Sequence, residues 1–278
     1  PLGQTITFIR QVKDSVDRAE VRSFSTATGK TSVLFAREGT AKKLTIDQPG
    51  NRYGFLFSAD TIKEKVYALY YGTLISGEPK PVVSIETRGM PIGWSPSENA
   101  DLSFSENGLH LFLGTAPKPA PEPKDSLLDE EKPQLDVWTW RDRELQPQQK
   151  INLDKEKKRT YLAVYLTDKD KFVQLADPSV KSVQTIRKGD GTIALGTDDT
   201  PYKLQASWTG RSLSDYYLID LETGNRQLAV KAKPMVSLSP AENFVVWYNP
   251  IDSGYYAKAT ATNKDSVRLT AGLPVSFC

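Results

Sequence analysis

The hydrophobic pattern of this chain is an alternation that repeats, with a polar turn in the middle of each repeat. In DYYLIDLETGNRQLAV (215–230), Tyr217, Ile219 and Leu221 alternate with their neighbours, and a second apolar run follows the turn. A period of two in residues that favour strands predicts two β-strands. The turn itself contains Gly224, which takes positive φ at no steric cost. The stretch therefore predicts a β-hairpin.

Similar hairpins are predicted elsewhere, and they are of two kinds. Long hairpins with charged turns resemble the one above and lie at residues 19–37, 65–85, 160–176 and 254–270. Shorter hairpins, in which the second strand is the more apolar one, lie between them at residues 43–58, 101–115, 183–197 and 234–249. Two of the short hairpins contain Asn107-Gly108 and Asp190-Gly191, which are strong hairpin-turn signals.

The two kinds of hairpin alternate, and pairing each short one with the next long one gives modules of four strands. This is the organisation of a β-propeller blade. We predict an all-β fold: a single β-propeller domain over residues 1–278, with an outer hairpin at 19–37 and blades at about 43–86, 101–176, 183–232 and 234–271. Because the chain begins and ends within a module, we expect an incomplete propeller of about four to five blades. The alternative is a small propeller whose terminal strands share one blade.

A proline-rich segment at residues 116–134 interrupts the second complete blade. Alternating prolines favour extended polyproline II, so the segment is predicted to be an insertion within the blade. The following LDVWTW (135–140) predicts a strand. Residues 141–159 are polar and charged, and they predict an exposed excursion with a short helical turn.

Composition excludes several classes of protein. The 36 basic and 34 acidic residues are interspersed and leave a formal charge of +2, which argues against nucleic-acid binding. No run of 18 apolar residues is present, so membrane insertion is not predicted. The one cysteine, Cys278, allows no internal disulfide.

No catalytic, cofactor-binding or metal site is predicted in this chain. A Ser-His-Asp triad needs a serine on a strained turn and a histidine as its base. The closest sequence, GWSPS (93–97), lacks the second glycine, and the only histidine, His110, lies inside a predicted strand. The acidic pairs Asp198-Asp199 and Asp168/Asp170 lack the spacing of a calcium loop.

Two groups of residues leave alternatives open. Glu130 and Glu131 could hold the amino terminus of a peptide, or they could belong to a solvated acidic loop. Four tryptophans could line a ligand groove or pack between blades, and strand positions favour packing; they are Trp138, Trp140, Trp208 and Trp247. The basic run KEKKR (155–159) is interpreted as a solvated face.

Several stretches resemble a known family. SFSENGLHLFL (103–113) and SLSPAENFVVW (237–247) resemble the repeated signature of the propellers in prolyl-oligopeptidase-family peptidases and TolB-like proteins. LDVWTWRDRELQPQQ (135–149) more specifically resembles a bacterial group of exported peptidases of that family.

The resemblance implies a non-catalytic propeller that gates the access of oligopeptides to a C-terminal α/β-hydrolase domain absent from this chain. It also implies an exported protein, periplasmic or extracellular. No catalytic residue can be carried over, because the serine motif and triad are missing, and Glu130 and Glu131 lie on an insertion and not on the family's propeller helix. The alternatives are a TolB-like scaffold that binds proteins and a carbohydrate-active propeller with two carboxylates. Open blade edges further predict self-association.

Overall fold

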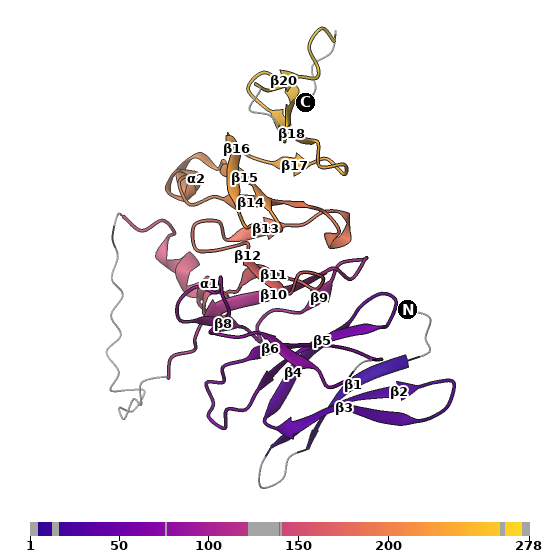
Figure 1. Ribbon diagram of the computed structural model, residues 1–278. Coiled ribbons are helices and arrows are strands. Elements are labelled where there is room, and N and C mark those ends of the chain that lie inside the picture. Colours follow the sequence, from indigo (N-terminus) through magenta and orange to yellow (C-terminus); the bar gives the residue numbers. More distant parts are fainter. Residues whose placement is uncertain are drawn as a thin grey trace, which may run out of the picture.

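The computed structural model describes residues 5–12, 17–75, 77–121, 139, 141–261 and 265–273. It consists of five antiparallel sheets that follow one another in chain order. Figure 1 shows them stacked from the first sheet, at the N-terminal end, to the fifth, at the C-terminal end. The predicted all-β propeller-type fold of four-stranded blades is confirmed. None of the helices in these residues is long and apolar enough to cross a membrane.

The first sheet has three strands in the order β1 (Thr5–Val12), β2 (Arg18–Ser25) and β3 (Thr31–Glu38). The predicted hairpin at 19–37 corresponds to β2 and β3, and β1 is a further strand that the prediction lacked. It pairs with β2 over its whole length, from Thr5↔Ser25 to Val12↔Arg18. Its alternation places the apolar Ile6 and Phe8 on the exposed side of the sheet.

The second sheet has the order β4 (Thr40–Ile46), β5 (Arg52–Ser58), β6 (Ala68–Thr73) and β7 (Lys80–Val83). The third is built on β10 (His110–Pro117), which pairs with the short strands β8 (Trp94–Pro96) and β9 (Ser103–Phe104) on one side. On its other side β10 pairs with β11 (Tyr161–Leu166), which is followed by β12 (Lys171–Gln174).

A twelve-residue helix, α1 (Gln146–Lys157), lies between β10 and β11. The sequence predicted only a short helical turn here, so the predicted length of the helix was too small. Pro147 in the first turn and a run of Gln, Lys and Glu without glycine account for a longer helix. The insertion predicted at 116–134 starts too early, because Ala116 and Pro117 belong to β10 and pair with β8. Its residues 122–134 lie outside the described residues, as does the strand predicted at 135–140 except for Thr139, which is not in a strand.

The fourth sheet has the order β13 (Ser182–Gln184), β14 (Ile193–Asp198), β15 (Ser214–Asp220) and β16 (Arg226–Lys233). The β13–β14 connection contains a 3-10 turn, η1 (Arg187–Gly189), so Asp190-Gly191 is not the tight two-residue turn that its sequence indicates. A second helix that was not predicted, α2 (Lys203–Thr209), lies between β14 and β15.

The fifth sheet has the order β17 (Val236–Leu238), β18 (Phe244–Asn249), β19 (Gly254–Ala259) and β20 (Val267–Arg268). Its strands are short, and β20 pairs with β19 at only two positions, Tyr256↔Arg268 and Ala257↔Val267. The fifth sheet is therefore a complete four-stranded blade with a weakly held outer strand.

The hydrophobic core is divided among the junctions between consecutive sheets. In the described residues there are four buried clusters, and each joins one sheet to the next. A sheet inside the stack is consequently buried on both faces. In β15, Ile219 packs toward the third sheet, whereas Tyr216 and Leu218 pack toward the fifth. This explains why residues 216–219 are an unbroken apolar run.

Hydrogen bonds between turns add a second connection at these junctions. Arg52 Nη1 donates to the carbonyl of Gly108 at 2.6 Å, and the Asn107 amide donates to Asp190 Oδ1 at 2.9 Å. In the next junction the Thr192 hydroxyl donates to Glu242 Oε2 at 2.5 Å. A Cβ at Gly191 would collide with the Glu242 carboxylate, so this close approach needs glycine.

Candidate functional site

The single histidine is held in place by contacts within the fold. His110 lies in β10, as the sequence indicates, and pairs with Leu166. Its Nδ1 is 2.6 Å from the carbonyl oxygen of Gly189 in η1, between β13 and β14 of the fourth sheet, a hydrogen bond that requires the proton on Nδ1. The ring also meets Phe112 edge-on, with centroids 5.9 Å apart. His110 therefore takes part in the junction between the third and fourth sheets.

The first serine of GWSPS, Ser95, is likewise a buried residue of a strand. Ser95 lies in β8, opposite Ala116 of β10, and is buried. A nucleophile of the hydrolase type stands on an exposed turn between a strand and a helix. Ser95 has neither the exposure nor the turn.

The acidic residues considered at the sequence level are dispersed. Asp198 accepts the Thr200 amide at 2.9 Å, and Asp170 accepts the Tyr165 hydroxyl at 2.7 Å, so both cap local structure. Within the described ranges, no three His, Cys, Asp or Glu side chains are grouped as they would be to hold a metal ion. Glu130 and Glu131 lie outside those ranges.

The tryptophans separate into two environments. Trp247 in β18 stacks on its cross-strand neighbour Tyr256, with ring centroids 5.8 Å apart and an interplanar angle of 11°. It is also buried in the hydrophobic cluster that joins the fifth sheet to the fourth. This is the packing between blades that strand positions favour. Trp208 is different, because it lies on α2 and not on a strand, and 84% of its surface is exposed. Trp138 and Trp140 lie outside the described residues.

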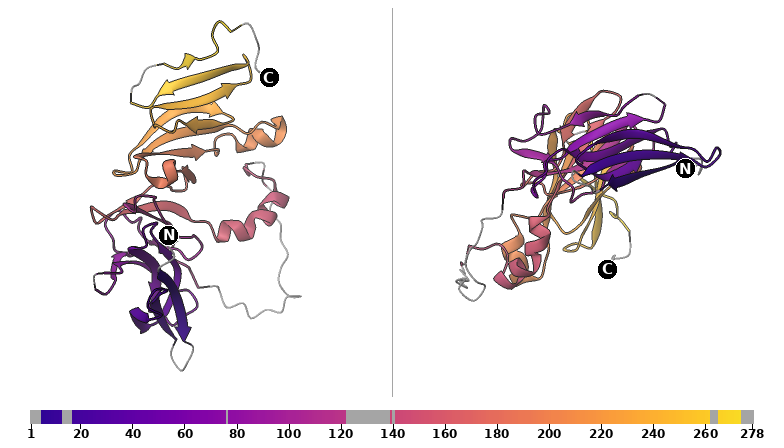
Figure 2. Two further views of the ribbon diagram at one scale, coloured as in Figure 1. Left: turned by 90° about the vertical axis from the view of Figure 1, so that its right-hand side faces the viewer. Right: turned by 90° about the horizontal axis from the view of Figure 1, so that it is seen from below.

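Trp208 belongs to a surface formed by the two helices. Figure 2 shows α1 and α2 leaving the stack on the same side. The Lys203 ammonium of α2 reaches Glu144, just before α1, at 2.5 Å and Asp199 at 3.7 Å. The hydrogen bond from Lys203 lowers the pKa of Glu144 below its ordinary value. We refer to residues 141–157 and 199–213 as the helical platform.

Large apolar side chains of the helical platform are exposed. Neither helix contains a buried residue, and Ile151 is 82% exposed. Leu145, Leu204 and Trp208 line a cleft of about 240 Å³ between the helices. Exposed apolar groups rimmed by charges are typical of a surface that contacts another domain or protein. Sequence reasoning missed this surface, since Leu145 and Trp208 are far apart in the chain.

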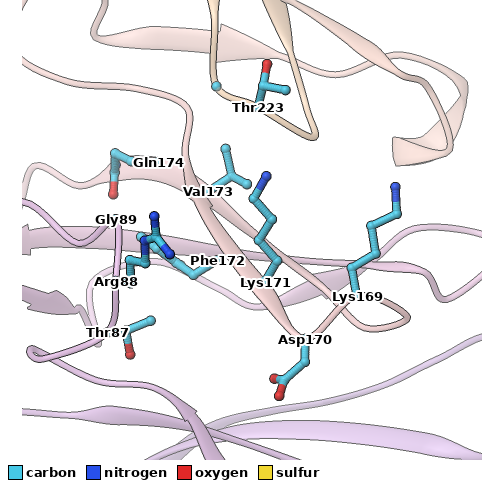
Figure 3. A pocket seen from close by; sticks show the side chains of 11 residues that line it. Thr87, Arg88, Gly89, Lys169, Asp170, Lys171, Phe172, Val173, Gln174 and Thr223 are labelled. Atoms are coloured by element: carbon cyan, nitrogen blue, oxygen red, sulfur yellow. The ribbon is translucent and has the colours of Figure 1, made fainter.

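A second cleft lies at the rim of the stack, between β12, the loop 87–89 and the turn 223–224, and has a volume of about 740 Å³. Figure 3 shows Lys169 and Lys171 directed toward the side of Thr223. Both lysines are held by the adjacent turn: Lys169 pairs with the Glu222 carboxylate at 2.7 Å, and Lys171 donates to the Glu222 carbonyl at 2.7 Å. At this cleft the third and fourth sheets are therefore connected by an ion pair and a hydrogen bond from two lysines.

Comparison with known proteins gives structural similarities only. No family model matches the chain, and no curated protein matches it. Among solved structures, the chain is similar to a eukaryotic initiation factor, with 10% identity and a TM-score of 0.43 over 95% of this chain and 52% of that one. It is also similar to the β-propeller domain of the trilobed protease from Pyrococcus furiosus, with 9% identity and a TM-score of 0.42 over 98% and 70% of the two chains.

A third similar structure is the acylaminoacyl peptidase of Pyrococcus horikoshii, with 9% identity and a TM-score of 0.41 over 97% of this chain and 38% of that one. The chain thus spans only about half the length of the initiation factor and less of the acylaminoacyl peptidase. The structures that the chain resembles thus include one described as the β-propeller domain of a protease. These similarities concern the fold, which the chain's own sheets establish independently.

Proposed function

We propose that this chain is the non-catalytic propeller region of a prolyl-oligopeptidase-like peptidase. In this proposal it admits oligopeptides to a hydrolase domain that is absent from the chain, and it keeps folded proteins out. The proposal follows from the sequence resemblance described above, which also implies export from the cytoplasm. The observation that carries it is where the sharpest part of that resemblance lies in the fold.

The stretch with the most specific resemblance, residues 135–149, leads directly into the helical platform. Its described part includes Arg143, Glu144 and Leu145, which line the clefts between α1 and α2. These residues contribute to an exposed surface and not to the packing of a blade. A stretch typical of a peptidase group therefore forms a surface that is suited to contact a second domain.

The chemistry of the helical platform fits a contact between domains. Interfaces between domains of one chain combine apolar contacts with many polar ones. Here Leu204 and Trp208 supply exposed apolar area beside the ion pair between Lys203 and Glu144. We propose that the hydrolase domain packs on this surface.

The serine and histidine of this chain support a proposal in which the propeller controls access and another domain carries out hydrolysis. Hydrolysis by a triad requires a histidine free to take the serine proton. His110, the only one in the chain, lies in β10 six positions from Ala116, the residue opposite the buried Ser95. At about 3.3 Å per residue the two side chains are roughly 20 Å apart, too far for a proton transfer. We assign the chemical step to the absent domain for this reason.

The proposal is tested by labelling with a fluorophosphonate probe, which reacts with activated serines. The probe is applied to this chain and to a version extended into the downstream coding region. We expect labelling of the extended protein alone. Labelling of this chain would contradict the division of labour, and no labelling of either protein would favour a TolB-like binding scaffold.

The role of the helical platform is tested in the extended protein with Trp208→Asp. If the hydrolase domain packs there, the variant should lose the restriction to short peptides and should cleave a folded substrate faster than the parent does. Ile92→Asp is the matched control, because Ile92 is fully exposed and lies outside the platform. Equal substrate size limits in all three proteins would exclude this surface as the docking site.

A further inference from the structure

The cleft of about 740 Å³ at the rim of the stack has the free edge of a strand as its floor. This strand is β12, the last strand of the third sheet, which pairs with β11 along one edge only. The loop 87–89 borders its other edge on one side, and the turn 223–224 borders it on the opposite side. The cleft therefore leads to backbone groups of β12 that the sheet itself does not use.

The pairing with β11 decides which backbone groups of β12 face the cleft. The Leu162 carbonyl accepts hydrogen bonds from the chain just after β12, so Leu162 and Val164 both direct their backbone groups toward β12. The partner of Val164 is Val173, whose N–H and C=O are therefore used within the sheet. Phe172 and Gln174, on either side of Val173, consequently direct their N–H and C=O groups away from the sheet and into the cleft.

The two walls of the cleft leave these backbone groups accessible. A Cβ on Gly89 would lie 3.5 Å from the carbonyl oxygen of Phe172, and a side chain there would cover the edge of β12. A Cβ on Gly224 would lie 3.1 Å from the carbonyl oxygen of Gln174. Among the described residues, no hydrogen bond engages the outward groups of Phe172 or Gln174. An unpaired edge of this kind is a template for a further strand.

Positive charges without a counter-ion surround this edge. Arg88 is exposed, and within the described part of the chain its guanidinium has neither an ion pair nor a hydrogen bond. Lys171 donates to the Glu222 carbonyl, but no described carboxylate pairs with it. Asp170 also lines the cleft, yet its carboxylate accepts the Tyr165 hydroxyl and points away from the lysines (Figure 3). The cleft thus presents two uncompensated cations, which favour an acidic ligand.

We propose that this cleft binds an extended acidic segment of another protein, which adds to the third sheet as a strand beside β12. A residue paired with Phe172 shares its face of the sheet, on the side of the loop that carries Arg88. The next residue lies on the opposite face, on the side of Lys171 and the turn 223–224. Two adjacent acidic residues would therefore meet both cations. The same cations disfavour pairing with a basic or purely apolar edge.

The short edge predicts weak binding. Phe172 and Gln174 each offer one N–H and one C=O, and a single hydrogen bond contributes little net free energy in water. We therefore expect an isolated peptide to bind with a dissociation constant on the order of 100 μM. The site does not depend on the function proposed above, because it lies at the rim of the stack and needs no hydrolase domain.

The test is fluorescence anisotropy of a labelled peptide of about eight residues, made of valine and threonine with a central Asp-Glu pair, titrated with the full 278-residue chain. Replacing the acidic pair by Asn-Gln should weaken binding about tenfold or more. Arg88→Gln and Lys171→Gln should each weaken it by about threefold or more, because each removes one of the two charges. Lys30→Gln, in the exposed turn between β2 and β3, is the matched control and should leave binding unchanged.

Hydrogen exchange separates strand addition from attraction between charges alone. The amides of Phe172 and Gln174 should exchange rapidly in the free chain and become protected by the peptide, whereas Val173 should be protected in both states. N-methylation of successive peptide amides should block binding at every second position. The proposal is overturned by a lack of saturable binding, by equal binding of the acidic and neutral peptides, by binding that does not depend on Arg88 and Lys171, or by unprotected amides. Circular dichroism of each variant separates lost binding from misfolding.

Discussion

The first and fifth sheets occupy equivalent positions at the two ends of the stack (Figure 1). Their outer faces nevertheless differ in chemistry. In each sheet the inner face is buried by a neighbour, through Phe35 at one end and Trp247 at the other. The outer face of the first sheet combines Ile6, Phe8 and Val33 with a cluster of charges. On the outer face of the fifth sheet, the strands β17 to β20 place no charged residue: the positions are Ser237, Phe244, Val246, Tyr248, Tyr255, Ala257, Ala259 and Val267.

The charge cluster of the first sheet is internally paired. Glu20 is only 9% exposed and accepts from Arg22 at 2.8 Å, with Arg10 at 3.6 Å and Arg18 at 3.9 Å. Such a face is stable in water because its charges remain partly hydrated and satisfied. The comparison teaches that two antiparallel sheets at equivalent ends of the stack can present outer faces of opposite chemistry, and that the side chains on those faces make the difference.

The largest effect is expected from the inner side of the first sheet. Phe35 is 2% exposed and lies within 5.0 to 5.3 Å of the rings of Phe55, Phe57 and Tyr70. Phe35→Ala should lower the free energy of unfolding by about 3–5 kcal/mol through the cavity it leaves. Urea denaturation followed by fluorescence measures this. A loss below about 1 kcal/mol would mean that the first sheet is not anchored by this cluster.

An intermediate effect is expected from the charged outer face. Glu20→Ala would leave three arginines without their shared carboxylate, and it should cost about 1–3 kcal/mol of unfolding free energy. Added salt should reduce the loss, since screening weakens repulsion between the arginines. Arg18→Ala is the matched control and should change stability by less than about 0.5 kcal/mol, because Arg18 is half-exposed and the most distant of the three. Equal losses in both variants would argue against a cluster centred on Glu20.

The smallest effect is a local dependence on pH at the fifth sheet. The Tyr256 hydroxyl donates a hydrogen bond to Asp252 and holds the pKa of that carboxyl below its ordinary value of 3.8. The stabilisation is present above that ordinary value and is lost as the pH falls through the lower pKa of the folded state. An NMR titration of the Tyr256 ring should show this acid step, and Asp252→Asn should abolish it. A step that persists in the variant would have another origin.

Local pattern was sufficient for most strands but not for the helices. The hairpin at residues 215–230 is β15 and β16, with Gly224 at a φ of 74°, because alternation and turn residues act over a few positions. The length of α1 was underestimated, and α2 was not predicted. Neither buries a residue, so neither needs the apolar period of 3.6 by which a helix is recognised. The exposed Trp208 was expected on a strand for the same reason.

The sequence by itself determined the strands, their order and the repeat of four-stranded units, since these depend on neighbouring residues and short turns. It also argued against a self-contained triad, because the chain lacks the serine motif and its one histidine lies inside a predicted strand. Only the tertiary structure decided which turns meet, as in the bond from Asn107 to Asp190. It alone brought Lys203 to Glu144. These features depend on contacts between residues distant in the chain, for which alternation and turn residues carry no signal.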